Sequence, residues 1–436
     1  MLFNSPIQKI FFYNIPVILF SLMPLFLITG PFFSDLSISL IGILFLIYCI
    51  KEKNFSFFNN KYFYFFVIFW LYLIINSLFN NFNFDSLKIS FFYFRYALFV
   101  IALVAILEFN DRFIKYFFFT LFICFTVLIL DGFYQYFVGE NIIGLKSPNP
   151  TRVTSFFNDE MIMGSYLSRL WPILFGLSVF FFQKKNKLFL IFFLVFILSE
   201  TLIFLSGERS AFFFINFSAL FIILFSKNLA KLRIYSLILS LLFIVMISFI
   251  NPSAKERIFD TTVDQMNLFK SVNRDSDVNR DSDKVYIFSQ DHDAIYTSAY
   301  KMFLDHKVIG VGVKNFRNIC KNPKYFVKGR NACNPHPHNA YLQILTEIGL
   351  IGFLFLFIIL LFFIKNILKH LYLKFQNKNY YTDFEICILS GIALYLWPFV
   401  PTGNVFNNWL NIILILNLPF LIWGIKSNKN QKNEQN

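Results

Sequence analysis

The sequence predicts an all-α protein, a transmembrane helical bundle of about 12 spans with one large external loop. Hydrophobic residues make up 57% of the 436 residues and charged residues only 15%, whereas soluble domains carry roughly 25% charged residues. Apolar runs of roughly 20 residues recur along the chain, and a helix of that length crosses a hydrocarbon core of about 30 Å. Because these runs are continuous rather than alternating, they favour helices over a membrane barrel.

Basic residues between the apolar runs predict the orientation. Lysine and arginine gather in the loops after even-numbered spans, as at Lys184, Lys185 and Lys374, and are sparse in the other short loops. The positive-inside rule therefore predicts cytoplasmic termini. The formal charge of +14 is thus a topology signal and does not indicate nucleic-acid binding. We place the spans near residues 10–29, 35–50, 62–80, 87–108, 114–138, 160–182, 188–206, 209–226, 233–250, 340–364, 384–400 and 406–424.

Four regions follow from these spans. Residues 1–250 hold the first nine spans, 251–337 form an external loop, 338–425 hold the last three spans, and 426–436 form a cytoplasmic tail. The loop contains an exact repeat, VNRDSD at 272–277 and 278–283. Its Asp-Ser-Asp pairs could ligate calcium, but the loop has neither the glycine turn nor the terminal bidentate glutamate of a known calcium loop. A duplicated, solvated linker is the simpler interpretation.

Two of the five cysteines, Cys320 and Cys333, lie in this external loop, while the others lie in or next to spans. An oxidising compartment permits a disulfide between them. Closing such a loop would contribute roughly 3 kcal/mol by the chain-entropy model. We expect this bridge, with two unpaired thiols as the alternative.

Three segments at the external ends of spans carry polar side chains able to do chemistry: Thr151–Asn158, Ser206–Ser210 and Asn334–Asn339. Ionisable groups near membrane depth are costly and usually line a cavity or a substrate path. Arginine suits phosphate through its planar fork of donors, and a neutral histidine accepts a proton near neutral pH. A lone arginine here often anchors to lipid headgroups. Because all three segments face one side, they favour a site for a phosphate-bearing lipid.

The third segment leads into a long apolar helix. Asn339 is a good N-cap residue, and a helix start attracts anions. Gln343 and Glu347 are four residues apart and therefore share a face. Glu347 is either paired with another span or turned to substrate. Gly349 and Gly352 predict a small surface for close helix packing.

A metal site is a weaker hypothesis for the same loop. His336 and His338, with Asp291, His292 and Asp293, supply potential ligands. Zinc requires about four ligands in tetrahedral geometry. Two histidines spaced by one residue between prolines match that geometry poorly, so we expect no metal.

One stretch resembles a known family. His338-Asn339, nine residues, Gly349, two residues and Gly352 resemble the signature of the O-antigen ligase and polymerase superfamily. The Gly-x-Gly segment in 305–316 and the segments 131–135 and 206–210 are also similar to those of the family. The resemblance covers about residues 120–355.

The resemblance implies membrane glycosyl transfer without cofactor, metal or nucleotide sugar. The donor would be a glycan on undecaprenyl diphosphate, at the periplasmic face of the bacterial inner membrane. His338 would activate the acceptor hydroxyl, and Arg152 and Arg209 would hold the diphosphate. Gln135, like Asn339 and Glu347, would support the site. Glu208 departs from the family pattern, so we expect it to neutralise part of the charge of Arg209.

The sequence leaves three alternatives for the identity of the acceptor. The acceptor is lipid A core oligosaccharide for a ligase, a second lipid-linked glycan for a polymerase, or a protein for an oligosaccharyltransferase. A transporter of the lipid-linked glycan would share the basic outer site. It would also show inverted repeats and charges near mid-membrane, and we find no such repeat.

Overall fold

The computed structural model describes residues 14–80, 83–182, 186–250, 252–268, 284–327, 332–378 and 380–435, without the side chains of 186–190 and 429–435. Within these ranges the chain is helical and has no β-strand, which confirms the all-α class. The repeat at 272–283 lies outside the described residues. The helices with eight residues or more are α4 (Pro31–Lys51), α5 (Lys61–Phe79), α6 (Phe84–Phe92), α7 (Phe94–Phe109), α8 (Phe113–Val138), α9 (Met163–Phe182), α10 (Asn186–Leu205), α11 (Arg209–Phe225), α12 (Ala230–Ile250), α15 (Gln290–Asp305), α17 (Ala340–Phe375), α18 (Asp383–Leu396) and α19 (Asn408–Gln435).

The apolar runs form helices, but not every run is one full-length span. Eight helical stretches among the described residues are long and apolar enough to cross a membrane, and two further apolar stretches, in α10 and α11, are shorter. The first run is divided at Leu22 into α2 (Ile15–Ser21) and α3 (Met23–Thr29). Pro24 lacks the N–H that would continue the helix. The multi-span class is therefore confirmed, while the number of about 12 spans stays a prediction.

Helix α9 is the centre of the bundle. Within the apolar window of each helix, 78% of α9 is buried, against 17% of α5 and 22% of α12 and α17. Helix α9 packs against α8, α10, α11 and α18. The more exposed helices carry apolar side chains on their outer faces, as expected for helices whose solvent is lipid.

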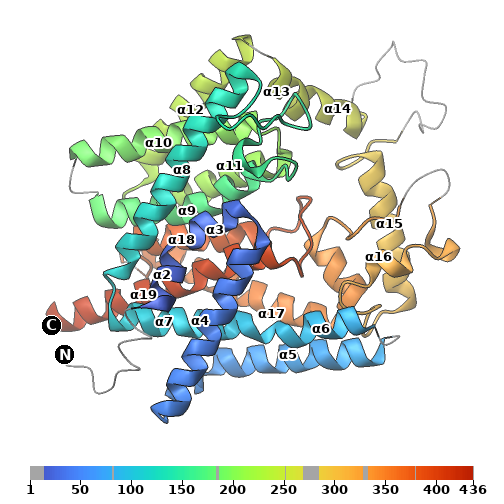
Figure 1. Cartoon of the computed structure of the whole chain (residues 1–436), viewed down its shortest axis with the longest axis horizontal. Coiled ribbons are helices and arrows are strands. Elements are labelled where there is room, and N and C mark those ends of the chain that lie inside the picture. Colours follow the sequence, from blue (N-terminus) through green and yellow to red (C-terminus); the bar gives the residue numbers. More distant parts are fainter. Residues whose placement is uncertain are drawn as a thin grey trace.

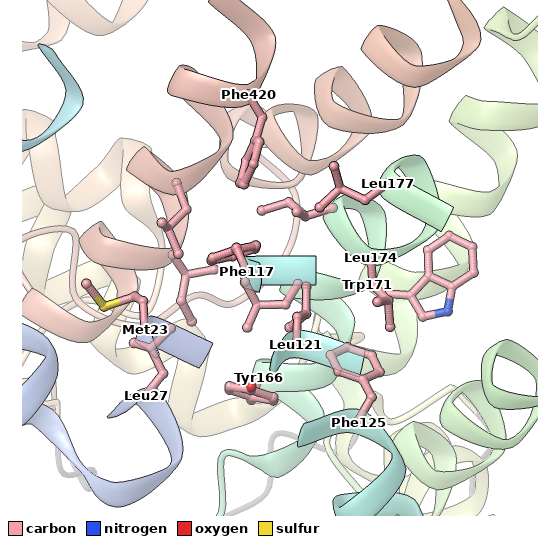
Figure 2. Close-up of a cluster of buried hydrophobic side chains, with 14 of the residues drawn as sticks. Met23, Leu27, Phe117, Leu121, Phe125, Tyr166, Trp171, Leu174, Leu177 and Phe420 are labelled. Atoms are coloured by element: carbon pink, nitrogen blue, oxygen red, sulfur yellow. The ribbon is translucent and has the colours of Figure 1, made fainter. Parts of the chain in front are cut away.

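The core joins helices that are far apart in sequence. Figure 2 shows Phe117 of α8 among side chains from the N-terminal helices, α9 and α19. The ring centroid of Phe117 lies 4.9 Å from that of Phe20 and 5.1 Å from that of Phe420. Aromatic pairs of this kind contribute about 0.5–1.5 kcal/mol beyond their buried area. They tie the start of the chain to its last helix.

The loops meet at two ends of the bundle. At the first, which we call the lysine end, the backbone N–H of Lys227 donates to Asp383 Oδ1 at 2.6 Å. Lys426 pairs with Glu108 at the same end. This end thus gathers the segments 108–112, 226–229, 376–378 and 380–382 with residue 426.

The second end, which we call the histidine end, gathers the segments 139–162, 206–208, 252–268, 284–327, 332–339 and 397–407. Arg152 binds the Ser206 carbonyl there, and the Thr402 N–H binds the His338 carbonyl. In Figure 1, α15 and α16 (Phe316–Ile319) lie at this end on the right, whereas α19 finishes on the left. All three polar segments singled out in the sequence thus lie at one end.

Candidate functional site

The segment that carries His338 is fixed by its backbone and by Asn339. His338 has φ +55°, a left-handed conformation that is uncommon for a residue other than glycine. Its carbonyl oxygen accepts from the Thr402 N–H at 2.8 Å. Asn339 Oδ1 caps α17 by accepting from the Leu342 N–H at 3.0 Å, and its Nδ2 donates to the Pro398 carbonyl at 2.8 Å. The expected N-cap is therefore present, and it also ties α17 to the loop after α18.

Three imidazole rings lie together around His338. Its ring centroid is 4.2 Å from that of His336 and 5.7 Å from that of His292. His336 Nε2 lies 3.3 Å from the Thr402 carbonyl oxygen, and His292 Nδ1 lies 2.7 Å from Ser289 Oγ. The ring of His338 has no hydrogen-bond partner within the part of the chain that the structure describes. Its nitrogens are therefore available to a substrate.

Burial keeps these imidazoles neutral. It lowers the pKa of His338 below its usual value of 6.5, and it lowers the pKa of His336 to about 4, with a further contribution from the charge of His338. A neutral imidazole can accept a proton at neutral pH. Over the described ranges, no group of three or more His, Cys, Asp or Glu side chains is arranged to hold a metal ion.

Arg152 is anchored on the protein. Its Nε donates to the Ser206 carbonyl at 2.9 Å, and its Nη2 donates to the Met161 carbonyl at 2.9 Å. Gly207, with φ +65°, allows this approach, because a Cβ there would lie 3.0 Å from Arg152 Cγ and 2.8 Å from Arg257 Cδ. Gly207 is thus the point around which two arginines pack.

Glu208 does not act as the sequence indicated. Its two carboxylate oxygens accept from the backbone N–H groups of Gly164 (2.7 Å) and Ser165 (3.0 Å), at the start of α9. The arginine that it faces is Arg152, at 3.9 Å, and no ion pair with Arg209 occurs among the described residues. The expected neutralisation of Arg209 is therefore wrong. Burial raises the pKa of Glu208 to about 7, although the charge of Arg152 opposes this shift.

Arg257 lies beside the predicted site residues, although the sequence did not predict it as a site residue. Arg209 Nε donates to the Arg257 carbonyl at 3.2 Å, and Arg209 Nη1 donates to Gln265 Oε1 at 2.5 Å. Arg257 Nε donates to the Gly207 carbonyl at 3.1 Å. Its two terminal nitrogens have no partner in the described ranges, so its fork is open to a ligand. The sequence signal for it was an arginine shortly after the end of the apolar run at 233–250.

Gln135 supports the Arg152 loop from α8. Its Oε1 accepts from the backbone N–H groups of Thr154 at 2.8 Å and Ser155 at 2.7 Å. Asp131, one turn earlier, accepts from the Ser155 hydroxyl and from the Ile142 N–H. Both side chains are buried. They hold the loop that delivers Arg152.

Glu347 is also committed to the protein. It is fully buried, and its oxygens accept from the backbone N–H groups of Lys314 (3.1 Å) and Phe316 (3.3 Å). Gln343 Nε2 donates to it at 2.9 Å, as expected for two residues on one helix face. Glu347 therefore anchors the loop before α16, and among the described residues it forms no ion pair with another span.

Gly349 interrupts α17. It has φ +64° and ψ −167°, and a Cβ there would lie 2.3 Å from the Val308 carbonyl oxygen. The loop 307–312 enters the break, where Leu350 N–H donates to Lys307 O and Gly312 N–H donates to Glu347 O, each at 2.8 Å. The expected role of Gly349 in packing two helices is therefore wrong. Gly349 instead allows a break in α17, which the loop 307–312 enters.

A disulfide joins Cys320 to Cys333, with 5.1 Å between their Cα atoms. Cys333 lies shortly before His336 and His338 in the sequence, so the disulfide restrains the chain that leads to them. Cys320 also belongs to a small apolar cluster with Ile295, Met302 and Phe316. The region of α15 and α16 therefore has a core of its own, against which α17 begins.

Part of the chain matches a known protein family. Residues 192–357 match the model of the O-antigen ligase family. This range contains Arg209, Arg257 and His338, while Gln135 and Arg152 precede it. No curated protein matches the chain. The match supports the O-antigen ligase and polymerase superfamily that the motif around His338 predicted.

Proposed function

We propose that this protein is a membrane glycosyltransferase, because residues 192–357 match the model of the O-antigen ligase family. It moves a glycan from undecaprenyl diphosphate to an acceptor hydroxyl. Lipid A core oligosaccharide is the first acceptor to test. The histidine end faces the periplasm of a bacterial inner membrane, and both termini are cytoplasmic. This orientation agrees with the basic loops gathered at the opposite end.

The open imidazole of His338 is the observation that supports this proposal most. It lies beside His292, at the same end of the bundle as Arg209 and Arg257. In the reaction, His338 takes the proton from the acceptor hydroxyl. The hydroxyl oxygen then bonds to the anomeric carbon, and the bond from that carbon to the diphosphate oxygen breaks. The leaving diphosphate keeps the electron pair.

The arginines stabilise the leaving group. Charge develops on the diphosphate as its bond breaks, and fixed cations near that charge lower the barrier. In the described ranges, both terminal nitrogens of Arg257 and the Nη2 of Arg209 have no partner, and a guanidinium binds phosphate oxygens with paired hydrogen bonds. Arg152, anchored on Met161 and Ser206, adds charge from its fixed position beside Gly207. The reaction on this proposal needs no metal.

A deletion strain tests the proposal. Its surface glycans would be compared after complementation with the wild-type gene, His338→Ala or Lys378→Ala, an exposed lysine at the opposite end. We expect Lys378→Ala to restore the wild-type glycan pattern and His338→Ala to fail although the protein reaches the membrane. Loss of long glycan from lipid A core would indicate a ligase, and loss of chain extension a polymerase. An unchanged glycan profile in the deletion strain itself would contradict both.

A further inference from the structure

A small polar cavity lies at the histidine end, and the residues that line it have no proposed role in the reaction so far. Its volume is about 170 Å³. One wall comes from the end of α14 (Thr261–Met266), and the other comes from the segment that leads into α15. The lining residues include Asp264, Gln265, Asn267, Tyr286, Ser289 and Asp291. Each of them carries a polar atom in its side chain, so the cavity suits a polar ligand.

Hydrogen bonds join the two walls of the cavity. The Tyr286 N–H donates to the Met266 carbonyl at 2.9 Å, and Asn267 Nδ2 donates to the Lys284 carbonyl at 3.1 Å. Asn267 has φ +57°, a left-handed conformation that asparagine tolerates better than most residues. The side chains of Tyr286 and Ser289 are buried. Contacts within the protein therefore hold the walls in place before any ligand binds.

The cavity borders both halves of the proposed site. On one side, Gln265 Oε1 accepts from Arg209 Nη1 at 2.5 Å. On the other side, Ser289 Oγ lies 2.7 Å from His292 Nδ1. The ring centroid of His292 lies 5.7 Å from that of His338. One lining residue thus contacts an arginine proposed to bind diphosphate, and another is linked to the proposed base through a single histidine.

The lining offers both donors and acceptors of hydrogen bonds. In the described ranges, the donor Gln265 Nε2 and the acceptors Asn267 Oδ1 and the Asp291 carboxylate have no partner. A hydroxyl group both donates and accepts, so a ring with several hydroxyls can bond to all three. The carboxylates of Asp264 and Asp291 disfavour an anionic group such as the diphosphate itself.

The size of the cavity agrees with a single ring. Pockets that hold drug-sized ligands have volumes of roughly 300–1,000 Å³. The cavity of about 170 Å³ is smaller, so it fits one small polar group better than a lipid chain or a longer glycan.

We infer that this cavity binds the first sugar of the donor glycan, the ring that is attached to the diphosphate. The inference rests on the proposed function, in which Arg209 and Arg257 hold the diphosphate and His338 activates the acceptor hydroxyl. The anomeric carbon of that ring carries the bond to the diphosphate and receives the acceptor oxygen. The ring therefore has to lie between the arginines and His338, and the cavity borders both. Its two carboxylates select a neutral sugar over a uronic acid.

A pair of donor lipids tests the inference by binding alone. The purified full chain in detergent would be titrated with undecaprenyl diphosphate, and separately with undecaprenyl diphosphate that carries one N-acetylglucosamine residue. We expect the wild type to bind the sugar-bearing lipid more tightly. Asp291→Ala should weaken binding of the sugar-bearing lipid by roughly tenfold, because it removes a hydrogen bond to a charged group. It should leave binding of the sugar-free lipid unchanged, which also shows that the variant is folded.

The matched control is Asp293→Ala, which removes the same charge from the same first turn of α15 at a residue that does not line the cavity. Asp293 pairs with Lys284 at 2.7 Å, and both side chains are exposed, so loss of the pair should cost little. The control should bind both lipids as the wild type does.

The outcomes separate this inference from the proposed function. Equal affinity of the wild type for the two lipids, or an equal loss for both lipids in Asp291→Ala, would overturn the sugar site and leave the proposed function standing. Loss of the sugar-dependent affinity in EDTA would also overturn it, because a bound cation would then hold the sugar. Arg257→Gln that binds both lipids as tightly as the wild type would instead count against the proposed function itself.

Discussion

The lysine end and the histidine end of the bundle both contain lysine or arginine side chains, but these side chains make different contacts at the two ends. At the lysine end, Lys374 Nζ donates to the Leu224 carbonyl at 2.8 Å, close to the end of α11, and Lys426 pairs with Glu108. These contacts complete helix ends, where cations are favoured. At the histidine end, Arg257 binds a carbonyl through Nε and leaves its terminal nitrogens open. Lys374 and Lys426 thus stabilise the fold, whereas Arg257 has terminal nitrogens that can bind a ligand.

Cysteine labelling tests most directly whether the two ends lie on opposite sides of the membrane. Its effect should be the largest, because a cysteine in intact spheroplasts is either labelled or not labelled. The described native cysteines give little background, since Cys49, Cys124 and Cys387 are buried and the other two form the disulfide. A membrane-impermeant maleimide should label Lys307→Cys in spheroplasts with intact inner membranes. It should label Lys378→Cys only after permeabilisation. The reverse pattern would invert the orientation and remove the histidine end from the periplasm.

Gly349→Ala should have the largest effect on folding. Its Cβ would lie 2.3 Å from the Val308 carbonyl oxygen, and the backbone is left-handed. The matched control is Gly139→Ala, which has φ +93° but no atom within 4 Å of the added Cβ. The control should cost about 1–2 kcal/mol from its backbone alone, while Gly349→Ala should lose the folded protein. Thermal unfolding in detergent measures both. Equal melting temperatures would mean that the loop is not locked into the helix break.

Arg257→Gln tests whether the open fork binds donor. Hydrogen bonds to charged groups are worth about 1.5–3 kcal/mol, so donor affinity should fall roughly 10–100-fold. Arg152→Lys keeps the charge but loses the anchored fork, and it should also weaken donor binding. Arg112→Gln, an exposed change at the lysine end, is the control for lost charge. Titration with undecaprenyl diphosphate measures all three variants. An effect of Arg112→Gln as large as that of Arg257→Gln would erase the distinction between the two ends.

The pH dependence of the transfer rate should be a smaller effect than the losses of folding or of donor affinity predicted above. His338 acts only when neutral, so the rate falls as the pH drops through its pKa. Because burial holds that pKa below 6.5, the rate should stay level from neutral pH to below 6.5 and decline only under more acidic conditions. A pH–rate profile of the purified protein checks this. A midpoint at or above 6.5 would show that the imidazole is not desolvated as the structure places it.

Local patterns in the sequence predicted the features that depend on nearby residues. Apolar runs predicted the helices, Asn339 predicted a cap, and the four-residue spacing predicted the contact between Gln343 and Glu347. Each of these involves residues within one turn or one helix. The family motif singled out His338 as the candidate base, and that role stays a prediction.

Contacts between distant segments could not be predicted in the same way. Glu208 stands next to Arg209 in sequence, but its side chain turns to α9 and Arg152. Gly349 resembles a packing glycine, and only the loop 307–312 shows that it opens the helix. Arg257 reaches Gly207 across about fifty residues, and no local pattern marks it.

The central claim is that His338 is the base at the histidine end, and single-turnover transfer by the purified protein tests it most directly. Donor binding and transfer would be measured separately for the wild type and His338→Ala. Removing a general base costs about 10² to 10⁴ in rate and need not change binding. We predict that His338→Ala binds undecaprenyl-diphosphate-linked glycan as the wild type does and transfers it at least about 100-fold more slowly. Transfer at the wild-type rate would contradict it.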